Sequence, residues 1–427
     1  MSLHRGTTVL AITLLSVVLA IGFSSTRFAS GEPPDPGSRT AQKKEESTAP
    51  TAAASRGDAP QTTALKVSVI HKPLYAKGSD GKVHLEYDLV STSVFPVPVT
   101  LTKVEVRASD GRRLLTLEGD ALEARTQPLG SSQPPTREVP ASGSLNTLVD
   151  IKVAPDKVPE RVTNRITYEL PPDAPEILEA IIGTHTIKGP MLKVPRRPAT
   201  VIAPPLSGEG WWNGNGCCDT TPHRSFRIAV DGERFVTPET FAIDWVQVGQ
   251  VTVDGEQINR TFEGDGTQNE QYFAFGANVR SATDGEVVEV RDGLPNETPN
   301  TDPVNVHLPL DVGGNHVVVR VSPGVYAFYG HLQPGSIDVQ EGDRVETGQL
   351  LGKLGSSGNS TQPHLHFDLS DGPDPLTSNS LPHVFDRYTW AGSVDVARST
   401  AENLVIEGTP RPERKTYPLF PSVVDFR

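Results

Sequence analysis

Polar and apolar residues alternate over short segments along much of the chain. In the segment Val83–Leu89 the odd positions hold Val, Leu, Tyr and Leu, whereas the even positions are polar. This period of two predicts a β-strand with one buried face. The same alternation recurs over 101–106, 148–153 and 166–170, with turn-forming residues in between. Because no long helical pattern interrupts them, these segments predict an antiparallel β-sandwich of the immunoglobulin-like type over residues 65–194.

A second series of strand-like segments lies between residues 206 and 395. Over 241–246 the large apolar residues Phe241, Ile243 and Trp245 share one face, so Asp244 is expected on the opposite face. Further along, His364 and His366 share one face of a short strand whose other face is apolar. The chain is therefore predicted to be mainly β, with two β domains.

A further strand-like segment, 326–331, places His331 on the same face as Tyr329 by this alternation. Imidazole nitrogens and carboxylate oxygens are zinc ligands, and a catalytic zinc site uses three protein ligands and leaves one position open. The His-x-His pair, Asp244 and His331 together suggest such a site. The alternative is that they are ordinary polar residues on the surface of a sheet.

Composition distinguishes the segments that lie outside the two predicted β domains. Residues 31–64 are rich in Pro, Ser, Thr and Ala and lack an apolar pattern, which predicts a disordered linker. The Pro-rich stretch 195–205 predicts a second linker between the two β domains. Residues 396–427 form a predicted C-terminal extension.

An apolar run, Val9–Phe23, follows Arg5 near the start of the chain. Its length suits the core of a signal peptide and is short for a membrane span. Residues 1–30 are therefore predicted to be a signal peptide, with an uncleaved anchor as the alternative. Export would place the protein in the periplasm or at the cell surface, in contact with a membrane only through this segment if it stays uncleaved.

The net charge excludes one class of partner. A formal net charge of −13 argues against nucleic acid as a partner, because phosphate binding needs a dense basic surface.

The sequence contains two adjacent cysteines. Cys217 and Cys218 are the only cysteines, and adjacent α-carbons about 3.8 Å apart are closer than an ordinary disulfide prefers. We expect two unpaired thiols, with a vicinal or an intermolecular bridge as alternatives.

Several motifs around the histidines are specific in combination. They are, in chain order, Tyr329–Leu332, Gly342–Val345, Gly348–Gly352, Gly355–Ser360 and Pro363–Phe367. Over residues 213–385 the chain resembles the lysostaphin-like zinc metalloendopeptidases, which cut cross-bridges and stem peptides of peptidoglycan. The resemblance implies an antiparallel β-sheet whose groove holds the metal.

The resemblance also implies roles for individual residues. Asp244 corresponds to the family's carboxylate ligand, and His366 corresponds to its last histidine ligand. His331 and His364 correspond to two catalytic histidines that do not bind the metal. Imidazole titrates near neutral pH, so either ring could move a proton during hydrolysis by a metal-activated water. Which of the two is the base is left open.

One position departs from the family pattern. The first histidine ligand usually stands four residues before the aspartate, where this chain has Thr240. His223 is the only histidine between the linker and Asp244, so it is either the third zinc ligand or a structural residue. Arg224, its neighbour, is expected either to orient Asp244 or a substrate carboxylate, or to be exposed.

These observations predict an exported zinc metalloendopeptidase that acts on peptidoglycan peptides, with Zn²⁺ as cofactor. The alternative is a degenerate domain of the same fold, which would bind or activate another cell-wall hydrolase and which the threonine at position 240 favours. A carbohydrate-binding surface protein is a third possibility. Residues 65–200 contain no ligand cluster in the sequence, so they are predicted to be dispensable for bond cleavage. The sequence leaves the oligomeric state open.

Overall fold

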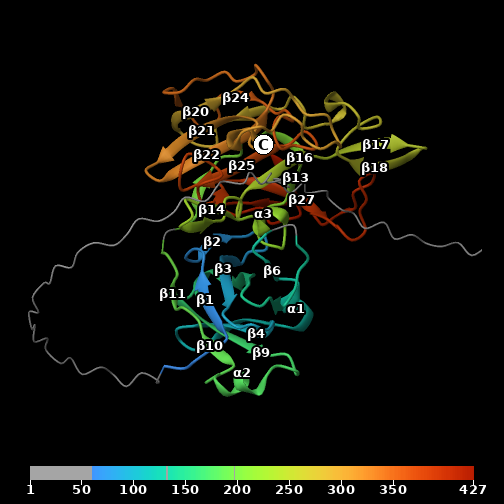
Figure 1. Ribbon diagram of the computed structural model, residues 1–427. Helices are drawn as coiled ribbons and strands as arrows, with labels where there is room; N and C mark the ends of the chain where they lie inside the picture. The colour runs from blue at the N-terminus through green and yellow to red at the C-terminus, as the bar shows by residue number, and fades with distance from the viewer. Residues whose placement is uncertain (1–59, 131–132, 197) are drawn as a thin grey trace, which may run out of the picture.

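The computed structural model describes residues 60–427, apart from 131–132 and 197. The predicted signal or anchor, and nearly all of the predicted linker 31–64, lie outside this range. The described part of the chain is mainly β, as predicted, with an N-terminal half and a C-terminal half at opposite ends of Figure 1. Within it, no helix has the length and apolar character needed to cross a membrane.

The N-terminal half is a sandwich of two antiparallel sheets. The first has the order β1-β3-β8-β6 with β2 on β3, and the second has the order β10-β9-β4-β5 with β11 on β9 and β7 on β4. Leu85 and Tyr87 of the first sheet share one core with Val104 and Ile166 of the second. The β-sandwich is confirmed, and its immunoglobulin-like type stays a prediction. The strands are β1 Leu65–Val69, β2 Leu74–Lys77, β3 Val83–Ser93, β4 Val99–Ala108, β5 Arg113–Glu118, β6 Thr126–Pro128, β7 Glu138–Val139, β8 Ser144–Val153, β9 Arg161–Glu169, β10 Thr186–Lys188 and β11 Leu192–Lys193.

Strand β3 differs from its prediction on one face. The alternation predicts one buried face, but the polar side chains of His84, Glu86 and Asp88 are buried as well, with 1%, 1% and 0% of their surface exposed. The C-terminal half covers them, through contacts described below. A period-two pattern reports which side chains are apolar and cannot reveal that another part of the chain covers the polar face.

The C-terminal half is built on an 11-stranded sheet with the order β23-β20-β21-β22-β25-β16-β13-β30-β27-β28, and β29 pairs with β27. The predicted C-terminal extension, 396–427, supplies β30 to the interior of this sheet, between β13 and β27. The strands are β13 Gly208–Gly214, β16 Ile243–Gln247, β20 Gly285–Arg291, β21 Asn315–Ser322, β22 Val325–Leu332, β23 Arg344–Val345, β25 Leu365–Ser370, β27 Tyr388–Val394, β28 Ile406–Glu407, β29 Arg411–Glu413 and β30 Ser422–Phe426.

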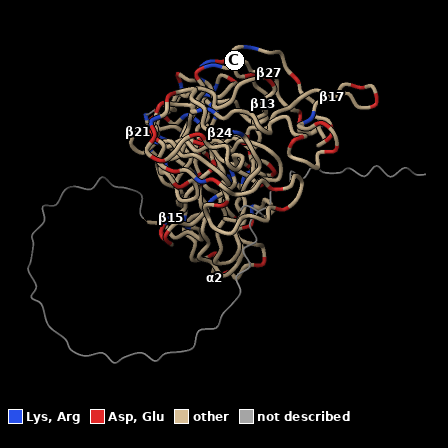
Figure 2. The backbone as a smooth tube through the Cα atoms, turned by 90° about the horizontal axis from the view of Figure 1, so that it is seen from above, with Lys and Arg blue, Asp and Glu red and all other residues tan. Residues whose placement is uncertain are grey.

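Smaller elements surround this sheet. Four two-stranded pairs are present, and the β17–β18 hairpin extends away from the body with acidic residues at its tip (Figure 2). The pairs are β12 Thr200–Ile202 with β26 His383–Phe385, β14 Ile228–Val230 with β15 Arg234–Val236, β17 Gly249–Val253 with β18 Glu256–Arg260, and β19 Asn278–Arg280 with β24 Leu350–Lys353. The short helices are α1 Gly119–Glu123, α2 Glu176–Ala180 and α3 Pro222–Ser225, with 3₁₀ turns at Pro155–Lys157, Asn269–Gln271 and Pro309–Asp311.

The core beneath the large sheet follows the predicted alternation. Ile243 and Trp245 of β16 pack with Leu365 and Phe367 of β25, and all four are fully buried. The residues between them on each strand must then face the other side of the sheet. Asp244 and His366 are thus directed to a common face.

The cysteine prediction is wrong. Cys217 and Cys218 are joined to each other by a disulfide, so neither is an unpaired thiol. They lie in the segment between β13 and α3, where the Cys217 N–H donates to the hydroxyl of Tyr417 at 3.1 Å. The average spacing of adjacent α-carbons therefore did not exclude a vicinal bridge.

Candidate metal centre

The centre begins with a cross-strand pair. Asp244 of β16 lies directly opposite His366 of β25 in the antiparallel register. Opposed residues of paired strands project from the same face and lie close together. The result is a contact of 3.0 Å between Asp244 Oδ1 and His366 Nδ1.

His223 reaches this pair from outside the sheet. It lies on α3, a single turn that begins with Thr221 as its cap and Pro222 as its first residue, both favoured at helix starts. The Nδ1–H of His223 donates to the carbonyl of Ala242 at 3.2 Å, which leaves Nε2 at 3.1 Å from Asp244 Oδ2. Ligand atoms of His223, Asp244 and His366 lie within 4.8 Å of one another.

Electrostatic effects couple these groups. Burial disfavours a charged His223, but the attraction of Asp244 and Glu239 outweighs it and raises the pKa of His223 to about 10. Burial would raise the pKa of Asp244, yet His223 and His364 hold it well below its usual range. The sequence did not point to two neighbours of the centre. Glu239 Oε2 lies 3.9 Å from His223 Nε2, and Asn215 Nδ2 donates to Asp244 Oδ2 at 2.8 Å.

The predicted orientation of His331 is wrong. Alternation places it with Tyr329, but its ring lies 4.5 Å from that of His364 and 5.9 Å from that of His366. The backbone of His331 has φ of 63°, in the left-handed region, which breaks the two-residue period at the end of β22. Tyr329 stays in the core, where its hydroxyl accepts from the Ala282 N–H at 2.8 Å.

Backbone carbonyls of the segment 355–362 hold both of the remaining histidines. The Nδ1–H of His331 donates to the Ser357 carbonyl at 2.7 Å, and that of His364 donates to the Gln362 carbonyl at 2.8 Å. Since a carbonyl only accepts, the neutral ring of His331 leaves Nε2 free to take a proton. Nε2 of His364 lies 3.5 Å from Asp244 Oδ1, and the attraction of this carboxylate outweighs burial and raises the pKa of His364. Gly358 adopts φ of 75°, and a Cβ there would lie 2.4 Å from the Gly314 nitrogen. Only glycine permits this close packing.

Other predicted residues have different surroundings. Thr240 is buried and its hydroxyl has no hydrogen-bond partner in the described structure. Arg224 is neither exposed nor in contact with Asp244, so these two expectations are wrong. Its side chain is 1% exposed, and its hydrogen bonds go to β3 rather than to Asp244.

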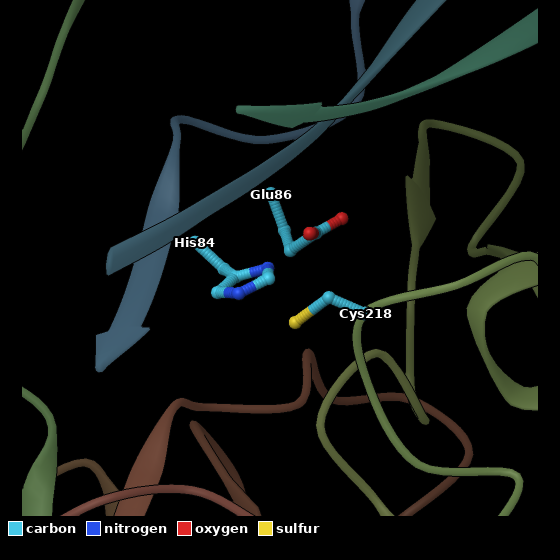
Figure 3. Close-up of side chains that lie close together, drawn as sticks. All are labelled: His84, Glu86 and Cys218. Atoms are coloured by element: carbon cyan, nitrogen blue, oxygen red, sulfur yellow. The ribbon is translucent and has the colours of Figure 1, made fainter. Parts of the chain in front are cut away.

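A second cluster of ligand-type side chains is shown in Figure 3. His84 and Glu86 of β3 lie close to Cys218 of the C-terminal half. The sulfur of Cys218 is bonded to Cys217, and Glu86 Oε2 accepts a hydrogen bond from Arg224 Nε at 2.7 Å. With these partners in place, the cluster does not offer three free ligands.

The donors of the first cluster fit zinc. Two imidazoles and one carboxylate are a ligand set of catalytic zinc sites. A histidine ligand commonly donates its other ring N–H to a backbone carbonyl, as His223 does to Ala242. His331 and His364 lie beside the cluster without belonging to it.

Comparison with known proteins agrees with the motifs. Residues 270–377 match the family described as Peptidase family M23, a stretch that includes His331, His364 and His366 but begins after Asp244. Glycyl-glycine endopeptidase ALE-1 of Staphylococcus capitis is 38% identical over 97 residues, or 22% of each chain. Peptidoglycan DD-endopeptidase ShyC of Vibrio cholerae is 44% identical over 55 residues, which are 13% of this chain and 12% of that protein.

These relatives are matched over at most about a quarter of their length. Among solved structures, the catalytic domain of lysostaphin from Staphylococcus simulans is 20% identical and covers 41% of this chain and 88% of its own. Its TM-score is 0.21. The sequence match and the motifs agree, and residues 270–377 are similar to Peptidase family M23.

Proposed function

We propose that the chain is an exported zinc metalloendopeptidase that hydrolyses peptide bonds of peptidoglycan. The observation that carries the proposal is the meeting of His223 Nε2, the Asp244 carboxylate and His366 Nδ1 beside the paired strands β16 and β25. The names of the relatives, a glycyl-glycine endopeptidase and a peptidoglycan DD-endopeptidase, support this substrate class. The apolar run after Arg5 supports export.

In this proposal His223, Asp244 and His366 hold the metal. Zinc, when bound, would act as a Lewis acid that makes water nucleophilic at neutral pH and polarises the scissile carbonyl. His331 and His364 act beside it as proton carriers, because a backbone carbonyl fixes Nδ1 of each ring and proton transfer falls to Nε2, which in His364 lies next to Asp244. Their rings can take a proton during attack and return one to the leaving amine.

The proposal is tested with the purified chain and purified peptidoglycan. Metal analysis should find about one zinc per chain, and mass spectrometry of the digest should find new amino termini within the peptides. A chelator should abolish product formation, and added zinc should restore it. His331→Ala serves as the matched control, because it should keep zinc and lose product.

The degenerate binding module remains the competing function, favoured by Thr240 at the usual ligand position. It makes a different prediction in the same experiment. A chain that sediments with peptidoglycan but holds no zinc and releases no peptide would establish the module and refute the peptidase.

A further inference from the structure

Among the three proposed ligands, His223 is the one that the sheet does not fix. Asp244 and His366 are held by strand register, whereas His223 lies on the four-residue α3 in the segment that joins β13 to β14. An isolated turn of helix is not stable by itself. Contacts with the rest of the molecule must therefore hold α3 in place.

The strongest of these contacts come from the N-terminal sandwich. Arg224 follows His223 directly, and all three of its side-chain hydrogen bonds go to consecutive residues of β3. Nε donates to Glu86 at 2.7 Å, Nη1 to Asp88 at 2.5 Å and Nη2 to the Tyr87 carbonyl at 3.1 Å. Figure 1 shows α3 at the boundary between the halves, next to the sandwich strands.

A second arginine strengthens the contact. Arg227 donates from Nη2 to Asp88 Oδ2 at 3.1 Å, and Asn146 Nδ2 donates to the same oxygen at 3.0 Å. Asp88 is fully buried and Arg224 is 1% exposed. Arg224 and Arg227 outweigh the effect of burial and lower the pKa of Asp88 to about 2, whereas burial and Asp150 raise the pKa of Glu86. Asp88 is thus the charged partner of the two arginines.

Adjacent helical residues point in directions about 100° apart. On α3 this geometry directs the two neighbouring side chains to different partners: His223 faces Asp244, and Arg224 faces β3. A rigid turn that is anchored by one side chain also fixes the direction of the next.

We propose that Arg224 and Asp88 are positioning residues for the metal centre, so that the N-terminal sandwich holds the third ligand, His223, in place. The inference rests on the proposed role of His223 as a ligand. It reverses the expectation that residues 65–200 are dispensable for bond cleavage. The centre is then a composite of both halves of the molecule.

The test measures metal affinity of the full chain rather than activity. Apo protein is titrated with zinc against a competing chelator, and with Co²⁺ while its visible absorption is followed. Asp88→Asn and Arg224→Met should each weaken zinc affinity about tenfold or more, the range seen when partners of metal ligands are lost. Arg224→Lys, which keeps the charge, should weaken it less. Arg260→Met removes another buried arginine, which pairs with Glu402 away from α3, and should leave affinity unchanged.

Thermal unfolding of each variant separates positioning from stability. A lower Tm with unchanged zinc affinity and cobalt spectrum, measured well below the transition, would show a purely structural contact and overturn the proposal. If Arg224→Met fails to fold, Arg224→Lys and Asp88→Asn decide the question by the same criterion. His223→Ala tells the two proposals apart. If His223→Ala loses zinc affinity while the Asp88 and Arg224 variants keep it, only the positioning role is overturned. If His223→Ala keeps its zinc affinity, the ligand assignment itself is overturned.

Discussion

Asp244 and His366 face each other across two hydrogen-bonded strands, with 3.0 Å between Oδ1 of one and Nδ1 of the other. The pairing is set by backbone register, and a slip of one residue would turn either side chain to the opposite face. The apolar neighbours prevent such a slip, because it would expose Trp245 or Phe367, both now fully buried. The core therefore holds two of the three proposed ligands in alignment before any metal is present.

We expect His223→Ala to lower zinc affinity about tenfold or more, because it removes one of three protein ligands. Thr240→Ala should change the affinity little, since the hydroxyl of Thr240 makes no hydrogen bond in the described structure. A chelator competition titration of both variants measures this directly. A large loss in the threonine variant would instead place its hydroxyl in the coordination shell.

Zinc binding and turnover should separate among the four other site residues. Asp244→Ala and His366→Ala are expected to lose zinc, whereas His331→Ala and His364→Ala should retain it and lose at least about a hundredfold in turnover as proton carriers. The measurements are zinc content by elemental analysis and peptide release from peptidoglycan. Equal zinc content in all four variants would contradict the division of roles.

Zinc affinity should rise with pH. With Asp244 and Glu239 holding the pKa of His223 at about 10 in the metal-free chain, its imidazole carries a proton through the neutral range. A ligand histidine must be neutral, so zinc has to displace that proton. The apparent affinity is expected to increase by about tenfold per pH unit below pH 10 for each proton displaced. Calorimetry in buffers of different ionisation enthalpy counts these protons, and a count near zero at pH 7 would contradict the expectation.

His383 should make the folded state sensitive to acid. It lies on β26 among the rings of Phe367, Phe385 and Tyr417, and burial lowers its pKa to about 3. The unfolded chain, with an ordinary value near 6.5, takes up this proton first. Stability is therefore complete above about pH 6.5 and declines toward pH 3, by about 1.4 kcal/mol per pH unit for this group.

Denaturant unfolding of His383→Leu across this range tests the effect. The variant should show a shallower loss of stability with falling pH than the parent. His307→Leu, at an exposed position, is the matched control and should keep the parental slope. Identical slopes for all three proteins would assign the acid sensitivity to other groups.

The sequence predicted those parts of the site that depend on local pattern. Alternation identified the polar faces that carry Asp244 and His366, and period-two strands fix side-chain direction without reference to the rest of the fold. It failed for His331, where a left-handed residue interrupts the strand geometry. No composition rule forecasts such a conformation at a histidine.

The remaining differences come from contacts between distant segments. Arg224 and Asp88 are charged residues that sequence reasoning places on the surface. Their burial depends on ion pairs between segments 136 residues apart, which also include Arg227 and Glu86. The same holds for β30, whose place in the sheet depends on partners far away in the sequence. Local sequence patterns do not reveal such contacts between distant segments.

The position of β30 also affects how the molecule is assembled. Strand β13 pairs on one side with β16, which carries Asp244, and on the other side with β30. Residues 208–214 therefore complete their backbone hydrogen bonds only when residues 422–426 have joined the sheet. Pairings between such distant segments form slowly, because a long loop must close first. Until then β13 presents a row of unsatisfied backbone groups, a template for association with other chains. A newly made molecule is therefore most vulnerable to aggregation during the interval before its final strand is inserted, and a chaperone that shields this open edge would be expected to raise the yield of native protein.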